Sequence, residues 1–219
     1  MEEDRRIRRE FLILLAIYLL PAIYTGTGPV DSSLFEQPRA HLGLLIQNVP
    51  RILLLLYLME IDGGAWSQRF GLSWKASRLP LQALGIALAL LIVSVVTNLV
   101  SRTLGFGGEP PFRFDSASPL AYLLSAFSLL SVGYMEELFF RSYAITRLEQ
   151  LGLSSTMAIL VSALLFSLGH SYQGVQGLLF ALLAGLALGY LFQKIHRIHP
   201  LAIGHAAYNY AGLLFSGLF

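Results

Sequence analysis

Runs of apolar residues without a charged side chain recur along this chain, and they constrain its fold more than any other feature. The segment Pro119–Gly133, for example, contains no Asp, Glu, Lys or Arg. Charged residues make up 13% of the 219 residues, whereas soluble domains carry roughly 25%. We therefore predict an all-α, polytopic membrane helix bundle that forms a single domain over residues 1–219. About seven membrane helices are expected from the apolar runs: Phe11–Tyr24, Leu42–Met59, Leu79–Val100, Pro119–Phe140, Met157–His170, Gln176–Phe192 and Pro200–Phe219.

The basic residues predict which side of the membrane each loop faces. If the N-terminus is inside, the cytoplasmic segments hold most of the Lys and Arg residues, as the positive-inside rule requires. These are Arg5, Arg6, Arg8, Arg9, Arg69, Lys75, Arg78, Arg141, Arg147, Lys194 and Arg197, against Arg39, Arg102 and Arg113 outside. We expect an N-in, C-out protein of the plasma membrane, and an endoplasmic-reticulum protein would show the same pattern.

The N-terminal segment allows two interpretations, an uncleaved membrane anchor or a secretory signal peptide. No small-residue cleavage site follows its apolar run, which favours the anchor. The chain has no cysteine, so disulfides, thiol catalysis and cysteine metal sites are excluded. No nucleic-acid motif accompanies the net charge of +2. We expect the lipid bilayer as the surroundings, no nucleic-acid partner and no cofactor.

Three charged residues end the apolar run that begins at Pro119. They belong to the sequence EELFFR, in which Glu137 and Arg141 lie four residues apart and can pair on one helix face. Glu136 points about 100° away from Glu137. The two neighbouring carboxylates are therefore expected to differ in role, with Glu137 in an ion pair and Glu136 aimed elsewhere. An ordinary interfacial charge cluster is the alternative.

Two later segments place polar side chains one helical turn apart. Phe166 and His170 share a face at the end of one apolar run, so the aromatic ring can shield the imidazole. His205 and Asn209 share a face in the last run, separated by small residues that let another helix approach. A single histidine at a helix end is also typical of a satisfied or interfacial residue, and the second pair alone is compatible with helix–helix hydrogen bonding. Together with Glu136, they favour one common site on three helices.

The turn near Gly152–Ser155 supports this common site. Glu136 precedes the turn by about as many residues as His170 follows it. An antiparallel hairpin would therefore bring the two side chains to a similar depth. His205 lies close to the predicted cytoplasmic loop, so the hairpin must project on that side of the bilayer to reach it.

The three motifs resemble, in order and spacing, those of the CAAX protease and bacteriocin-processing family, also called the CPBP or Abi family. The resemblance covers about residues 119–219. The matching residues are Glu136, Glu137 and Arg141 in EExxxR, Phe166 and His170 in FxxxH, and His205 and Asn209 in HxxxN.

This resemblance implies an intramembrane endopeptidase that depends on a glutamate and needs no metal. Glu136 would activate water, His170 would help to hold that water, and His205 with Asn209 would form the oxyanion hole. The pair formed by Glu137 and Arg141, with Phe166, would support the site. The expected substrate is a peptide or protein. A lipid-modified C-terminus, a peptide precursor and a membrane-anchored regulator are all compatible with such a peptidase.

Three other functions remain open from the residues alone. A glutamate with two histidines is a known catalytic zinc set, although no His-Glu-x-x-His sequence occurs. Intramembrane Glu and His residues also serve transporters and proton relays. A bacteriocin-immunity protein that binds a peptide without cutting it is the third alternative. Neither the substrate nor the oligomeric state follows from the sequence.

Overall fold

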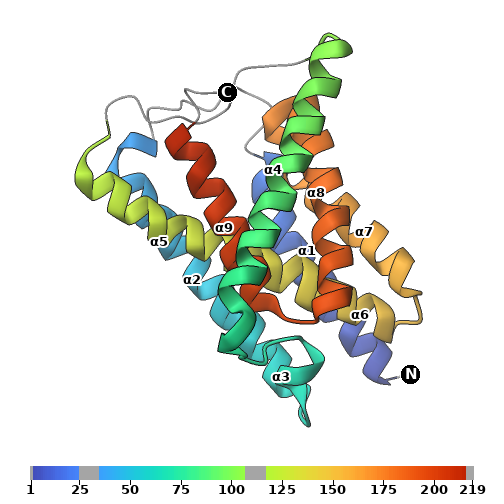
Figure 1. Cartoon of the computed structure of the whole chain (residues 1–219). Helices are drawn as coiled ribbons and strands as arrows, with labels where there is room; N and C mark the ends of the chain where they lie inside the picture. The colour runs from blue at the N-terminus through green and yellow to red at the C-terminus, as the bar shows by residue number, and fades with distance from the viewer. Residues whose placement is uncertain (1, 25–34, 107–116, 216–219) are drawn as a thin grey trace. The chain divides into compact units, whose positions relative to one another are not determined.

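The computed structural model describes residues 2–24, 35–106 and 117–215 (Figure 1). Most of these residues are helical and none of them forms a strand, so the predicted all-α fold is confirmed. The elements are α1 (Glu2–Tyr24), α2 (Pro38–Ile61), α3 (Trp66–Arg69), η2 (Ala76–Arg78), α4 (Leu79–Thr103), α5 (Pro119–Glu136), η3 (Glu137–Ala144), α6 (Ile145–Gln150), α7 (Ser155–Leu168), η4 (Ser171–Gln173), α8 (Gly174–Ile195) and α9 (Ile198–Phe215).

Four helical stretches among the described residues are long and apolar enough to cross a membrane. They are Pro38–Ile61, Ala76–Thr103, Pro119–Gln150 and Ser171–Ile195. The shorter α7 is also apolar. The count of seven spans and the N-in orientation stay predictions. Arg113, used for that orientation, and residues 216–219 of the last predicted span lie outside the described residues.

The distribution of side chains matches a protein of the membrane interior. Large apolar residues point outward, as in Ile46, which is 72% exposed, and Leu81, which is 73% exposed. Charged side chains lie inside, where Glu137 and Arg147 are fully buried. Buried ionisable residues that face the interior of a bundle are typical of functional sites in membrane proteins.

The chain divides into two compact units, each assembled from three stretches of sequence. The first unit contains Met1–Pro29, Val93–Gly108 and Phe140–Ile195. The second unit contains Val30–Ile92, Glu109–Phe139 and His196–Phe219. The single domain predicted over residues 1–219 stays a prediction.

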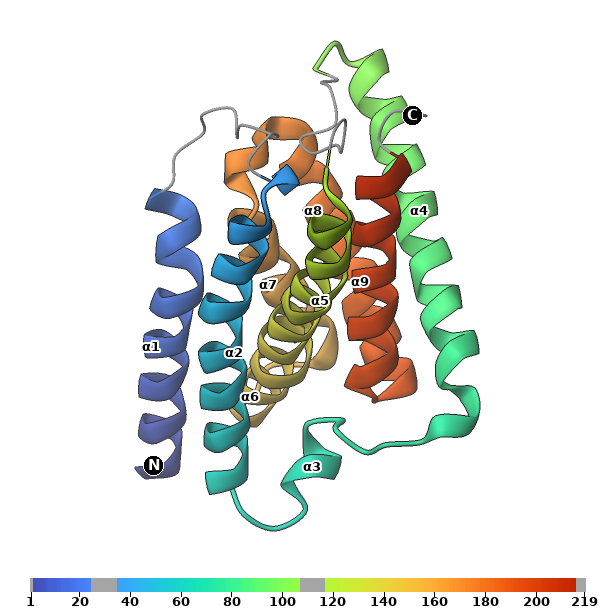
Figure 2. The same ribbon diagram turned by 90° about the vertical axis from the view of Figure 1, so that its left-hand side faces the viewer.

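In the second unit, α5 packs against α2 and also against α9 (Figure 2). Buried polar pairs join α5 to α2. Asn48 Nδ2 donates to Ser131 Oγ at 3.2 Å, and His41 Nδ1 lies 2.9 Å from Ser128 Oγ. Hydrogen bonds of this kind link helices where water is excluded.

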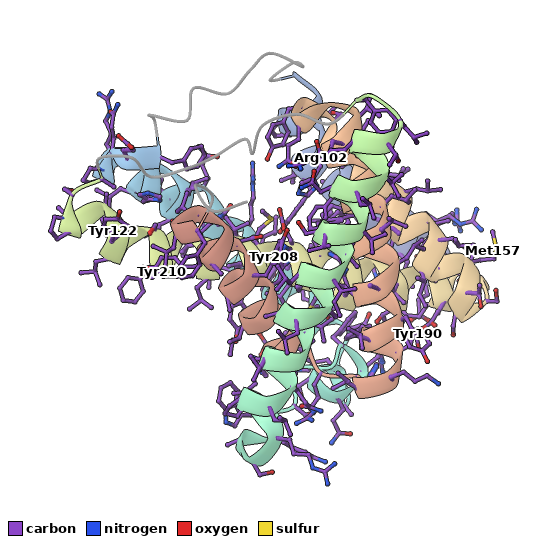
Figure 3. All side chains as sticks on the ribbon, turned by 45° about the horizontal axis from the view of Figure 1, so that its top comes forward. Arg102, Tyr122, Met157, Tyr190, Tyr208 and Tyr210 are labelled. Carbon is purple, nitrogen blue, oxygen red and sulfur yellow. The ribbon has the colours of Figure 1, made fainter. Side chains whose placement is uncertain are left out.

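A close approach of backbones joins α5 to α9. A Cβ atom added to Gly133 would lie 2.6 Å from the carbonyl oxygen of Ala202 and 3.3 Å from the Cβ of Ala206. Further along the same pair of helices, the Tyr210 hydroxyl donates to the Tyr122 carbonyl at 3.4 Å, and both tyrosines are labelled in Figure 3. Small residues therefore permit the contact that brings the end of α5 next to α9.

In the first unit, a helical hairpin turns at Gly152. Helix α6 ends in a Schellman motif, in which Gly152 has φ +95° and Leu153 N–H donates to the Leu148 carbonyl at 3.1 Å. Ser154 then caps α7 through its hydroxyl oxygen. The turn predicted near Gly152–Ser155 is thus present.

The two arms of this hairpin pack against each other. Ser162 Oγ on α7 donates to the Phe140 carbonyl at 2.6 Å, and the rings of Phe140 and Phe166 meet edge to face at 5.1 Å. Helix α8 then packs against α7, where a Cβ on Gly185 would come within 2.9 Å of Ala163 Cα.

Candidate active site

The EELFFR sequence continues α5 with a different winding. Glu136 is the last residue of α5, and Glu137 is the first residue of η3, a π-helix that ends at Ala144. A π-helix forms hydrogen bonds between residues i and i+5, and such segments occur frequently at functional sites. The spacing of Glu137 and Arg141 was interpreted for an α-helix, but the α-helix ends at Glu136.

His205 on α9 is approached by both carboxylates. Its Nδ1 lies 2.9 Å from Glu137 Oε1, and its Nε2 lies 3.7 Å from Glu136 Oε2. The Glu137 side chain is fully buried, whereas the His205 and Glu136 side chains are 7% and 14% exposed. Nδ1 of His205 is therefore within hydrogen-bond distance of the Glu137 carboxyl group. The second unit thus holds a cluster of two carboxylates and an imidazole, in which only Glu136 is partly exposed.

Asn209 lies one turn beyond His205 on α9 and is partly exposed. Residues four apart share a helix face, so the carboxamide and the imidazole lie on the same side of α9. Glu136, Glu137, His205 and Asn209 all belong to the second unit. The structure brings the first three into direct proximity, with Asn209 next along the helix.

His170 belongs to the first unit and follows the end of α7. Its Nδ1 lies 2.8 Å from the Phe166 carbonyl oxygen, and the two rings are 4.4 Å apart. The contact between ring and imidazole predicted from the FxxxH spacing is present. Because a carbonyl only accepts, Nδ1 of His170 carries the proton, and Nε2 is the acceptor atom of the neutral ring.

Arg141 is buried in the first unit, with its guanidinium carbon 4.2 Å from the centre of the Phe166 ring. This distance is typical of a cation–π contact. The predicted ion pair between Glu137 and Arg141 joins residues assigned to different units, and so does the predicted meeting of Glu136 with His170. Both stay predictions.

A further polar link between α5 and α9 was not predicted from the sequence. The Tyr134 hydroxyl lies 3.0 Å from His199 Nδ1, and His199 Nε2 donates to the Leu72 carbonyl at 3.1 Å. Since Nε2 carries the proton, Nδ1 of the neutral ring accepts from Tyr134. This link lies just before the two glutamates, but no periodicity or local spacing connects its members.

Within the described part of the chain, no three His, Asp or Glu side chains are grouped as ligands for one metal ion.

Comparison with known families supports the interpretation of the second half of the chain. Residues 118–211 match the family described as type II CAAX prenyl endopeptidase, Rce1-like. The resemblance proposed from the three motifs is therefore confirmed over this region. The match indicates a CAAX-type peptidase that acts on a protein or peptide in a membrane. Searches of curated proteins and of solved structures returned no significant match.

Proposed function

We propose that this protein is an intramembrane endopeptidase in which Glu136 activates a water molecule to hydrolyse a peptide bond. The observation that carries the proposal is the cluster of Glu136, Glu137 and His205, in which Glu137 is fully buried and the other two side chains are mostly buried. The cluster lies within the matched region, residues 118–211. The proposed substrate is a lipid-modified or membrane-anchored protein, and the proposed location is the plasma membrane.

Peptide hydrolysis needs a base for water and donors for the developing oxyanion. In the proposed mechanism, Glu136 accepts a proton while the water oxygen attacks the carbonyl carbon. It returns the proton to the leaving amine when the C–N bond breaks. Glu136 suits this role better than Glu137, because its side chain is partly accessible and its contact with His205 is longer.

His205 and Asn209 would donate to the oxyanion. The Nδ1–H of His205 is already directed at Glu137, 2.9 Å away, so Nε2 donates only when the ring carries a proton on both nitrogens. Glu137 would thus hold His205 in orientation, in addition to the predicted pair with Arg141.

The FxxxH motif supports a role for His170. Within the first unit, its Nδ1 lies 2.8 Å from the Phe166 carbonyl oxygen, so Nε2 is the acceptor atom of the neutral ring. Glu136 belongs to the other unit. From the resemblance of the motifs, we infer that His170 Nε2 accepts a hydrogen bond from the same water that Glu136 deprotonates.

A cleavage assay with Glu136→Gln tests this function. The substitution preserves size and hydrogen bonding but removes the base, so cleavage should be abolished while folding and insertion are retained. The probes are quenched peptides ending in a CAAX sequence, with and without a prenyl group, added to purified protein in nanodiscs. Comparing the proteomes of membranes that contain the intact or the Glu136→Gln protein extends the test to native substrates.

Glu60→Gln serves as the matched control, because Glu60 is an exposed carboxylate at the end of α2. This variant should cleave at the rate of the unchanged protein. Full activity in purified Glu136→Gln would refute the assignment of Glu136 as the base.

A further inference from the structure

A cationic surface lies on the second unit, where the connection between α2 and α4 meets the start of α9. This basic surface consists of Lys75, Arg78 and Arg197 and is bordered by Trp74. Lys75 and Arg78 are exposed, and Arg197 is partly exposed. Figure 2 shows the α2–α4 connection, which carries α3, beyond the C-terminal end of α2.

Hydrogen bonds hold the basic surface together. The Ile198 N–H donates to the Gly71 carbonyl at 2.8 Å, which ties the connection to the first residue of α9. Arg197 Nη1 donates to the Lys75 carbonyl at 3.3 Å, and Arg197 Nη2 donates to the Gln82 side chain. Cations more than a hundred residues apart in sequence are therefore kept next to one another.

The described carboxylates do not neutralise the basic surface. Nearby, Arg69 is ion-paired with Asp62. Among the residues that the structure describes, no carboxylate is ion-paired with Lys75, Arg78 or Arg197. Three clustered cations attract an anion, and the attraction strengthens where part of the surroundings is hydrocarbon.

The position of the basic surface matches the boundary between water and hydrocarbon. Trp74 is 60% exposed, with its ring edge-on to His199 at 4.7 Å. Tryptophan is enriched at the level of lipid headgroups. The apolar helix α4 starts directly after Arg78, and its residue Leu81 is 73% exposed. The basic surface and Trp74 therefore lie at the N-terminal end of α4, a helix with exposed apolar side chains.

We propose that the basic surface binds the phosphate headgroup of an anionic phospholipid, in the leaflet that the α2–α4 connection faces. The three cations supply the charge that recognises phosphate, and Trp74 lies against the upper acyl chain. An acidic protein segment would satisfy the charge but would not explain why an exposed tryptophan and a lipid-facing helix adjoin it. The proposal is independent of peptide cleavage.

Fluorescence quenching by lipids of defined charge tests the proposal. The chain has two tryptophans, so Trp66→Phe leaves Trp74 as the single reporter. The protein is placed in phosphatidylcholine vesicles with a small fraction of brominated lipid, either phosphatidylglycerol or phosphatidylcholine with the same chains. We expect brominated phosphatidylglycerol to quench Trp74 more strongly than brominated phosphatidylcholine. This preference for phosphatidylglycerol should decline as the salt concentration is raised.

Charge variants identify the residues responsible. In the Trp66→Phe background, the pair Lys75→Gln and Arg78→Gln should remove most of the preference, since each cation near a membrane surface contributes about fivefold in affinity. The pair Lys75→Arg and Arg78→Lys should retain it. Arg102→Gln, at the other end of α4, should leave it unchanged, because Arg102 is exposed there and bonded to Asn98.

Equal quenching by the two brominated lipids would overturn the proposal, and so would a preference that survives loss of both Lys75 and Arg78. Both substituted side chains are exposed, so the variants should fold, which circular dichroism checks. Because the readout is lipid contact rather than cleavage, a negative result here leaves the proposed peptidase function untouched.

Discussion

The imidazole of His205 has a carboxylate near each of its two nitrogens, and the two contacts differ. Glu137 is fully buried and lies 2.9 Å from Nδ1, a normal hydrogen-bond length. Glu136 is partly exposed and lies 3.7 Å from Nε2, which is an ion-pair distance rather than a hydrogen bond. Glu137 is therefore suited to fix the ring, and Glu136 to exchange its contact with His205 for one with water.

Coupling between Glu137 and His205 gives a prediction at this scale. Glu137→Gln and His205→Gln should each reduce kcat, by about 10²–10³ for His205 if it is an oxyanion donor. If Glu137 acts through His205, the double variant should be no slower than His205→Gln alone. The measurement is kcat of the unchanged protein, the two single variants and the double variant. If the loss of kcat in the double variant equals the product of the two single losses, the two residues act separately.

The sequence identifies the members of this cluster but not their partners. Helical spacing separated Glu136 from Glu137 and placed His205 and Asn209 on one face. The Glu137–His205 contact joins residues 68 positions apart. A contact between two residues on different helices produces no periodic pattern in the sequence of either helix. This pair could therefore not be predicted.

At the scale of elements, the site depends on how closely α5 approaches α9. Gly133 lies one turn before Glu137. It faces Ala202 and Ala206, which lie three residues before and one residue after His205. The absence of a side chain at Gly133 allows the two backbones to come together. The same contact therefore sets both helix packing and the distance from carboxylate to imidazole.

Gly133→Ala tests this dependence. The new Cβ would lie 2.6 Å from the Ala202 carbonyl oxygen, so α5 and α9 must move apart. Overpacking of this kind destabilises by about 1–3 kcal/mol, and cleavage should fall with it. Thermal unfolding in detergent and the cleavage assay are the measurements.

Gly43→Ala is the control, because a Cβ on Gly43 of α2 meets nothing within 4 Å. Alanine is the better helix former by roughly 0.5–1 kcal/mol, so this variant should be as stable as the unchanged protein or slightly more stable. Equal stability and activity in Gly133→Ala and Gly43→Ala would contradict the close-approach account.

The helices themselves could be predicted well from the apolar runs, but their ends and winding less so. Helix α1 begins at Glu2, before the apolar run that starts at Phe11, because its charged first turns are also helical. The π-helical winding of η3 has no signature in residue type or spacing.

At the scale of the whole molecule, composition predicted a membrane protein correctly, because so low a charge content cannot cover a soluble surface. The division into two units could not be predicted. Each unit draws on three separate stretches of the chain, and helix α4 and the α5–η3 helix contribute to both. Long-range pairing of this kind is not encoded in local hydrophobic patterns.

Metal dependence is a property of the complete site and separates two hydrolytic mechanisms. The proposed glutamate mechanism predicts that cleavage by purified protein is unchanged after treatment with EDTA or 1,10-phenanthroline. Loss of activity on chelation, with recovery on addition of zinc, would favour the zinc set of one glutamate and two histidines instead.

The central claim is that Glu136 and His170 meet at one water molecule, and cysteine cross-linking tests it most directly. The chain contains no cysteine, so introduced pairs react without background. Glu137→Cys with His205→Cys is the positive control, since these side chains are in contact. Arg78→Cys with Arg102→Cys, at opposite ends of α4, is the negative control.

The measurement is the yield of cross-linked Glu136→Cys/His170→Cys protein in membranes treated with a short bifunctional methanethiosulfonate. The account predicts a yield close to that of the positive control. A yield no higher than that of the Arg78→Cys/Arg102→Cys pair would contradict it, because two groups that never come close cannot share a water.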